Sequence, residues 1–146
     1  MRNVRIAFEE FDCPLAEILP GYTKLNCHLI FEVKLNESFR RKARFVANGH
    51  RTKALKSLSY YMVVSRDSVH IVFLLAALNN LQVVSCDIQN AYLAAPCREK
   101  YYSIAGSEFG SDKGKVYIVR RALYGLKTSG ASFRKFLAES FIDMGF

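Results

Sequence analysis

A carboxylate at the end of an apolar stretch is the residue of this sequence best suited to chemistry. Val83 to Cys86 is a short run rich in β-branched residues, which predicts a buried strand. Asp87 ends that run, and the polar pair Gln89 and Asn90 follows. A buried carboxylate is costly unless a metal ion or a base pairs with it. The alternative is a structural Asp that caps a helical turn beginning at Gln89.

Three cations alternate along a second segment, which could bind an anion. Arg40, Lys42 and Arg44 share one face of the strand predicted over Phe39 to Asn48, because successive side chains of a strand point to opposite faces. Like charges this close repel one another unless water or an anion screens them. The segment is therefore either a solvated basic face or a phosphate-binding surface, since ammonium and guanidinium groups both suit phosphate oxygens.

Three motifs resemble those of one enzyme family, the Ty1/copia-type reverse transcriptases. The segment from Asp87 to Leu93 (DIQNAYL) resembles the family's first catalytic motif. Arg121 to Ser129 (RALYGLKTS) is similar to its second hallmark, and Lys42 to Gly49 (KARFVANG) is similar to its fingers motif. Each motif alone is a weak signal, but the three occur in the family's order with roughly its spacing. The resemblance extends from about Gly21 to Phe146.

The resemblance implies a fold and a division of the chain. The implied fold is α+β, with a reverse-transcriptase-like fingers hairpin and a partial antiparallel palm sheet packed on two helices. It implies a single incomplete reverse transcriptase domain over residues 1–146, fingers-like at about 21–60 and partly palm at about 61–146. The hydrophobic pattern agrees, because period-two alternation over 26–35 and 39–48 predicts the two strands of a hairpin.

The resemblance also implies roles for individual residues. Asp87 matches the catalytic, metal-binding aspartate, and the backbone carbonyl of Ile88 is implied as a secondary ligand. Tyr92 matches an aromatic steric gate that excludes a ribose 2′-hydroxyl, and a core tyrosine is the alternative. The other positions that match nucleotide-binding residues are Lys42, Arg44, Asn90, Ala91, Tyr124, Gly125 and Lys127. The implied partners are an RNA or DNA template-primer and dNTP, with Mg²⁺ or Mn²⁺ as the cofactor.

The aspartates predict that the chain is catalytically incomplete by itself. A pair of Mg²⁺ ions needs more than one carboxylate, and the family supplies the others from a hairpin bearing Tyr-x-Asp-Asp. No such hairpin occurs up to Phe146, and no two aspartates are adjacent. The aspartates are Asp12, Asp67, Asp87, Asp112 and Asp143. The expected function is thus a fragment of an RNA-directed DNA polymerase that is inactive alone.

Two alternative functions stay open. The formal net charge of +8 and a pI near 9.5 favour polyanionic partners, which suits a basic nucleic-acid- or nucleotide-binding module without catalysis. The other alternative is a non-functional retrotransposon remnant or a protein-interaction piece. An unpaired strand edge and uncovered apolar surface would make such a piece prone to associate.

The elements that must position these residues include two helices. Ser65 or Asp67 can cap a helix that runs to about Asn80. That helix is apolar nearly all round, which predicts burial on several sides. A last helix is predicted from about Ser129 to Met144, with Gly145 as its C-cap.

Composition bounds the class of protein. The longest apolar run, Ile71 to Leu78, is too short to span a bilayer, and the first ten residues are too polar for a signal peptide. The chain is therefore expected to be intracellular, not secreted and without a membrane partner. The four cysteines lack the spacing of a zinc site, so we expect reduced and mostly buried thiols.

Overall fold

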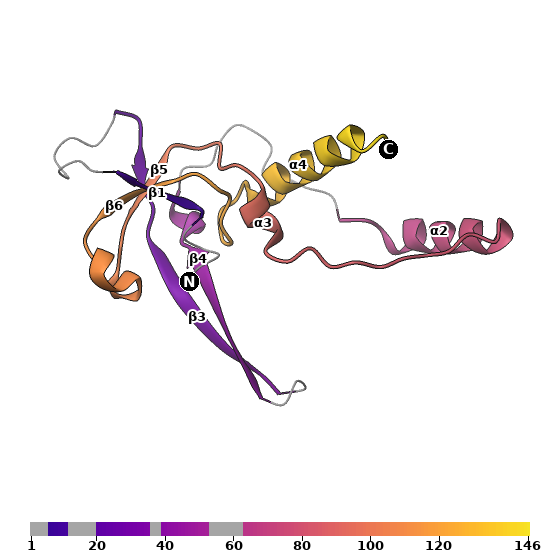
Figure 1. Ribbon diagram of the computed structural model, residues 1–146, viewed down its shortest axis with the longest axis horizontal. Helices are drawn as coiled ribbons and strands as arrows, with labels where there is room; N and C mark the ends of the chain where they lie inside the picture. Colours follow the sequence, from indigo (N-terminus) through magenta and orange to yellow (C-terminus); the bar gives the residue numbers. More distant parts are fainter. Residues whose placement is uncertain (1–5, 12–19, 36–38, 53–62) are drawn as a thin grey trace.

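The computed structural model of this chain has a mixed α+β architecture (Figure 1). It describes residues 6–11, 20–35, 39–52 and 63–146. These residues form a four-stranded sheet, a separate two-stranded hairpin and two main helices. The expected α+β class is therefore confirmed.

The four-stranded sheet is mixed, so the expected antiparallel arrangement is wrong at one edge. Its strands, in the order in which they pair, are β1 (Phe8–Phe11), β6 (Val116–Val119), β5 (Tyr101–Ile104) and β2 (Thr23–Lys24). β6 runs antiparallel to both neighbours and all four of its residues are buried, whereas β2 runs parallel to β5. A parallel neighbour follows from the long connection between these strands, since only a tight turn forces antiparallel pairing.

The predicted hairpin is confirmed. β3 (Cys27–Lys34) pairs antiparallel with β4 (Arg40–Ala47), and the register runs from Cys27 opposite Ala47 to Lys34 opposite Arg40. Residues 36–38, where the turn is predicted, lie outside the described residues. The apolar face predicted for β3 is covered only near the base, because the hairpin projects beyond the sheet (Figure 1). Phe31, halfway along, is 76% exposed.

Aromatic rings fix the base of the hairpin to the sheet. The Phe45 ring of β4 lies 5.9 Å from Phe8 of β1 and 5.7 Å from Phe109, between ring centroids. Phe109 belongs to the 3-10 helix η3 (Ser107–Asp112) and stacks on Tyr117 of β6 at 5.6 Å. Edge-to-face and offset-stacked pairs of this kind add to the stabilisation from burial.

A second buried cluster joins the hairpin base to the segments that follow the sheet strands. Ala47 of β4 and Leu93 of α3 (Ala91–Ala94) pack in it with Leu123. The other buried members are Ala7, Leu25, Tyr101, Val119 and Leu126.

Capping residues set the ends of the two long helices as predicted. α2 (Arg66–Leu78) begins after Ser65, whose Oγ accepts the backbone N–H of Ser68 at 3.1 Å. α4 (Ser129–Asp143) ends before Gly145, which has a φ of 90°. The short helix α3 packs against α4.

The expected burial of α2 is wrong. Ala76 is its buried residue, while the apolar side chains around it are largely exposed, Leu78 at 73%. The strand expected at Val83 to Cys86 is also wrong: the segment has no strand partner within the described residues, and Val84 is 85% exposed. Figure 1 shows α2 and this segment extending away from the sheet, so no described element covers them. The sheet is therefore not packed on two helices as expected.

Two further expectations concern the chain's start and its surroundings. The sequence pattern also predicts a short strand at Val4 to Phe8; residues 4 and 5 lie outside the described residues, residues 6 and 7 form a turn, and β1 begins only at Phe8. Among the described residues, no helix has the length and apolar character needed to cross a membrane.

Leu123 is buried in the core and Leu78 is exposed on α2, so replacing each by alanine should destabilise the protein by different amounts. Leu123→Ala should lower the free energy of unfolding by about 2–5 kcal/mol, because Leu123 is 1% exposed and its removal leaves a cavity. Leu78→Ala, the same chemical change on α2, should cost less than about 1 kcal/mol. Urea denaturation followed by circular dichroism measures both, and equal losses would contradict the assigned core.

Candidate functional site

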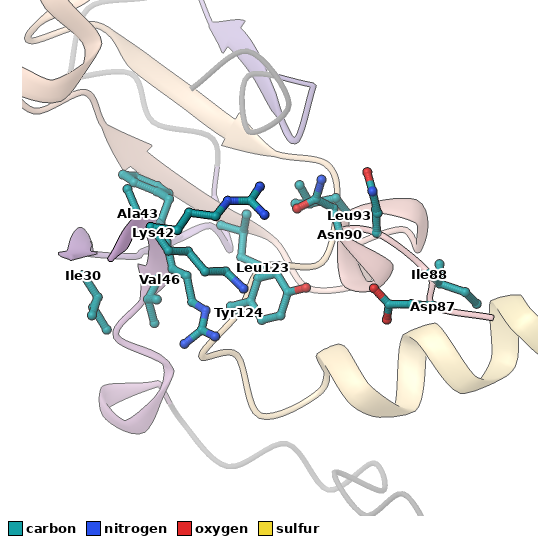
Figure 2. A pocket seen from close by; sticks show the side chains of 14 residues that line it. Ile30, Lys42, Ala43, Val46, Asp87, Ile88, Asn90, Leu93, Leu123 and Tyr124 are labelled. Atoms are coloured by element: carbon teal, nitrogen blue, oxygen red, sulfur yellow. The ribbon is translucent and has the colours of Figure 1, made fainter. Parts of the chain in front are cut away.

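A cleft of about 690 Å³ lies between the hairpin and the segment that precedes α3 (Figure 2). One wall comes from β4, the opposite wall from residues 87–90, and Leu123 and Tyr124 lie between them. The residues that line it are Ile30, Arg40, Lys42, Ala43, Arg44, Phe45, Val46, Asp87, Ile88, Gln89, Asn90, Leu93, Leu123 and Tyr124. Three segments that are far apart in the sequence therefore meet around one opening.

The β4 wall is basic. Arg40, Lys42 and Arg44 all line it, as the period-two pattern predicts. Arg44 forms an ion pair with Glu32 of β3, with 3.1 Å between Nη1 and Oε2, and both side chains are about half exposed. Exposed pairs of this kind contribute little net stability, so a bound phosphate could compete with Glu32 for Arg44.

The opposite wall carries Asp87. Its carboxylate does not cap α3, because Asn90 occupies the N-cap position and α3 starts at Ala91; the capping interpretation is therefore wrong. Asn90 has a left-handed backbone with a φ of 53°, a conformation that Asn tolerates better than most residues. In Figure 2 the Asp87 carboxylate and the Lys42 side chain point towards one another, with Tyr124 between them in this view.

Asp87 is the one carboxylate among the described residues that line the cleft. The described part of the chain brings together no group of three His, Cys, Asp or Glu side chains that could hold a metal ion. A divalent ion needs more oxygen ligands than Asp87 and the Ile88 carbonyl provide. These residues do not fit a complete metal site by themselves.

Backbone hydrogen bonds position the residues between the two walls. The N–H of Ala47, at the end of β4, donates to the carbonyl of Tyr124 at 2.7 Å. On the other side, the N–H of Ala122 donates to the carbonyl of Ala95, just after α3, at 2.9 Å. The segment from Ala122 to Tyr124 is thus bonded to β4 on one side and to the residue that follows α3 on the other.

The sequence of the chain matches the family described as reverse transcriptase (RNA-dependent DNA polymerase) over residues 21–146. The chain belongs to this reverse transcriptase family. The resemblance to its Ty1/copia-type members is also confirmed by individual relatives. No solved structure matches the chain.

The similar proteins are retrotransposon polyproteins. The chain is 30% identical over 122 residues to the retrovirus-related Pol polyprotein from transposon TNT 1-94 of Nicotiana tabacum, a match that covers 77% of the chain and 9% of that polyprotein. It is 32% identical over 114 residues to the truncated transposon Ty1-A Gag-Pol polyprotein of Saccharomyces cerevisiae, covering 75% and 9%. With the yeast transposon Ty1-NL2 Gag-Pol polyprotein the identity is 30% over 124 residues, covering 82% and 7%. The chain thus spans a small part of each relative.

Most of the family-matched residues converge on the cleft of this reverse transcriptase chain. Its lining includes Lys42, Arg44, Asp87, Ile88, Asn90 and Tyr124, and it lacks Ala91, Tyr92, Gly125 and Lys127. The Tyr92 ring lies next to a lining residue, 4.8 Å from the Tyr124 ring and 6.2 Å from the Phe133 ring of α4 between centroids. The Lys127 ammonium donates instead to the Thr52 carbonyl at 2.9 Å.

Sequence reasoning missed several lining residues. The sequence pattern places Arg40 on the basic strand face with Lys42 and Arg44, but Arg40 is not among the nucleotide-binding positions that the resemblance implies. Gln89 lies inside the first catalytic motif but was assigned no role. Ile30, Leu93 and Leu123 are apolar residues whose position at the opening follows from tertiary packing, and no local pattern marks it.

Burial separates the described cysteines into two kinds. Cys86, next to Asp87, is exposed. Burial raises the pKa of the Cys27 thiol from 9.0 to about 11. Burial, with the Glu99 carboxylate nearby, raises the pKa of the Cys97 thiol to about 12. Cys13 lies outside the described residues.

These differences predict selective alkylation. At pH 8.5, iodoacetamide should modify Cys86 at least tenfold faster than Cys27 or Cys97, since only the thiolate reacts and the two buried thiols stay protonated. Peptide mapping by mass spectrometry after a short pulse measures the rates. Equal rates for the three cysteines in the folded protein would contradict the assignment.

The same pKa shifts affect stability. The thiols of Cys27 and Cys97 ionise at a lower pH in the unfolded chain than in the folded protein. They therefore favour the folded state below about pH 9, and that contribution is lost as the pH rises towards 12.

Proposed function

We propose that the cleft is the nucleotide-binding part of a reverse transcriptase active site. The observation that carries this proposal is the convergence of three distant segments on one opening: basic β4, residues 87–90 and the turn at Tyr124. The described cations and the carboxylate lie on opposite walls. This separation suits a deoxynucleoside triphosphate accompanied by a divalent ion, because the phosphates need cations and the ion needs a carboxylate.

Each wall has a role in this proposal. Lys42 and Arg44 bind triphosphate oxygens, and Arg44 exchanges its ion pair with Glu32 for one with phosphate. Asn90 and Ala91 present backbone N–H groups at the start of α3. Tyr124 supports the nucleotide, and Tyr92, whose ring lies 4.8 Å from the Tyr124 ring between centroids, acts as the steric gate against a ribose 2′-hydroxyl.

The proposal includes the division of the chain and its partners. Residues at about 21–60 act as the fingers and residues at about 61–146 as part of the palm, and an RNA or DNA template-primer lies against their basic surface. Asp87 alone does not complete a two-metal site, so we propose binding by this chain and no polymerisation by it alone.

Removal of a cleft cation should weaken nucleotide binding. Lys42→Ala or Arg44→Ala should lower the affinity for a fluorescent deoxynucleoside triphosphate, measured by anisotropy in the presence of Mg²⁺, by about tenfold or more, because a charge-assisted hydrogen bond is lost. Inorganic triphosphate should compete for the same site. Lys135→Ala removes an equal charge from α4, none of whose residues lines the cleft, and should leave the affinity unchanged.

Two results would overturn this proposal: no binding by the native sequence, or equal losses in Lys42→Ala and Lys135→Ala. The same preparations supplied with a primed RNA template and Mg²⁺ should extend no primer. Robust extension that Asp87→Ala abolishes would contradict the proposed incompleteness.

A second candidate function is a basic nucleic-acid-binding module without chemistry. The net charge of +8 and the exposed cations of β4 favour it. The logarithm of duplex affinity should then fall linearly with the logarithm of salt concentration, by about 0.9 per phosphate contact. Filter binding to a labelled RNA–DNA duplex at several salt concentrations measures the slope. A slope near zero, or no binding at low salt, would remove this candidate.

A further inference from the structure

Two glycines, one from each of two distant motifs, touch through their backbones. Gly125 has a φ of 92°, and a Cβ placed on it would lie 2.1 Å from the carbonyl oxygen of Ala47. A Cβ on Gly49 would lie 2.2 Å from the carbonyl oxygen of Gly125. Both distances are far inside van der Waals contact with backbone atoms that cannot rotate away. Neither position therefore has room for a side chain.

Three hydrogen bonds surround this contact. The N–H of Ala47 donates to the Tyr124 carbonyl at 2.7 Å. The Thr52 hydroxyl donates to the Gly49 carbonyl at 2.6 Å, and Thr52 is buried. Lys127 Nζ donates to the Thr52 carbonyl at 2.9 Å. These bonds and the two glycines form a joint between the end of β4 and the turn around Tyr124.

The joint connects the two sides of the cleft, so their spacing depends on it. β4 continues from Arg44 and Phe45 directly into Ala47, so any shift at Ala47 moves the basic face. The turn at Tyr124 is held on its other side through Ala122, which is bonded to Ala95 after α3. The spacing between the cations of β4 and the segment of Asp87 is thus set through this joint.

We propose that Gly49, Gly125 and Lys127 are positioning residues, which fix β4 against the turn at Tyr124 and so set the width of the cleft. Lys127 acts through the Thr52 carbonyl and not by touching phosphate. The consequence for ligand binding rests on the proposed nucleotide-binding function, whereas the geometric claim stands independently of it.

Distance measurement in the folded protein tests the geometric claim. Spin labels at Arg41→Cys on β4 and Lys135→Cys on α4, in a background with Cys13→Ser and Cys86→Ser, report the spacing by double electron–electron resonance. Both labelled positions are exposed. We expect one narrow distance distribution without further substitution, and a shifted or broadened one in Gly125→Ala.

A matched glycine isolates the effect of the contact. Gly114 has a φ of 89°, and a Cβ placed on it would meet nothing within 4 Å, so Gly114→Ala carries the backbone strain without the clash and should leave the distribution unchanged. If Gly125→Ala does not fold, Lys127→Met decides, because it removes a single part-buried hydrogen bond to Thr52 and should broaden the distribution. Unchanged distances in the folded variants would overturn the proposal.

Nucleotide affinity separates positioning from contact. Lys127→Met should weaken triphosphate binding several-fold at every salt concentration, whereas the loss in Lys42→Ala should shrink as salt screens the missing charge. A salt-sensitive loss in Lys127→Met, with unchanged distances, would identify a direct phosphate contact and overturn the proposal. Changed distances in a protein that binds no nucleotide would leave the joint standing and remove the proposed function instead.

Discussion

The site depends on the short segment from Arg120 to Leu126, which is bonded to β4 on one side and to the end of α3 on the other. Its first part holds the end of α3: the N–H of Cys97 donates to the Arg120 carbonyl, and the Arg121 guanidinium donates to the Ala94 carbonyl. Its second part holds β4 through the Tyr124 carbonyl. The buried Ser129 hydroxyl donates to the Leu123 carbonyl at 2.6 Å and ties the segment to the start of α4. A single irregular segment thus defines where the basic and acidic walls stand.

Irregular backbone is suited to this task because its polar groups are not used up by a ladder or a helix. The carbonyls of residues in the segment are free to accept bonds from elements on different sides, which a strand interior could not offer. The cost is that glycine is required where two backbones approach closely, as at Gly125 against Ala47. Functional residues carried on such a segment gain their precision from the rigid sheet and the aromatic cluster beside it.

The sequence predicted the local elements well, but it did not predict which apolar surfaces are buried by other elements. The hairpin, the Ser65 cap and the end of α4 at Gly145 follow from short-range patterns, and the structure confirms them. The failures are apolar segments. An apolar helix such as α2 predicts burial, but the pattern cannot tell whether the covering surface comes from the same stretch of chain. The match spans at most 9% of the three relatives described, so surface outside this stretch is available in proteins of this kind.

The candidate site shows the same division between local and tertiary information. Residue types and spacing identified Lys42, Arg44 and Asp87, and folding brings them to one cleft. Matching of motifs could not distinguish a residue that lines the cleft from one that supports it, because both kinds belong to the same motif. Lys127 illustrates the point: its charge suggests phosphate, yet its ammonium is directed to a backbone carbonyl 75 residues away in sequence. For short motifs of this type, the partner of each side chain decides its role, and that partner is a property of the fold.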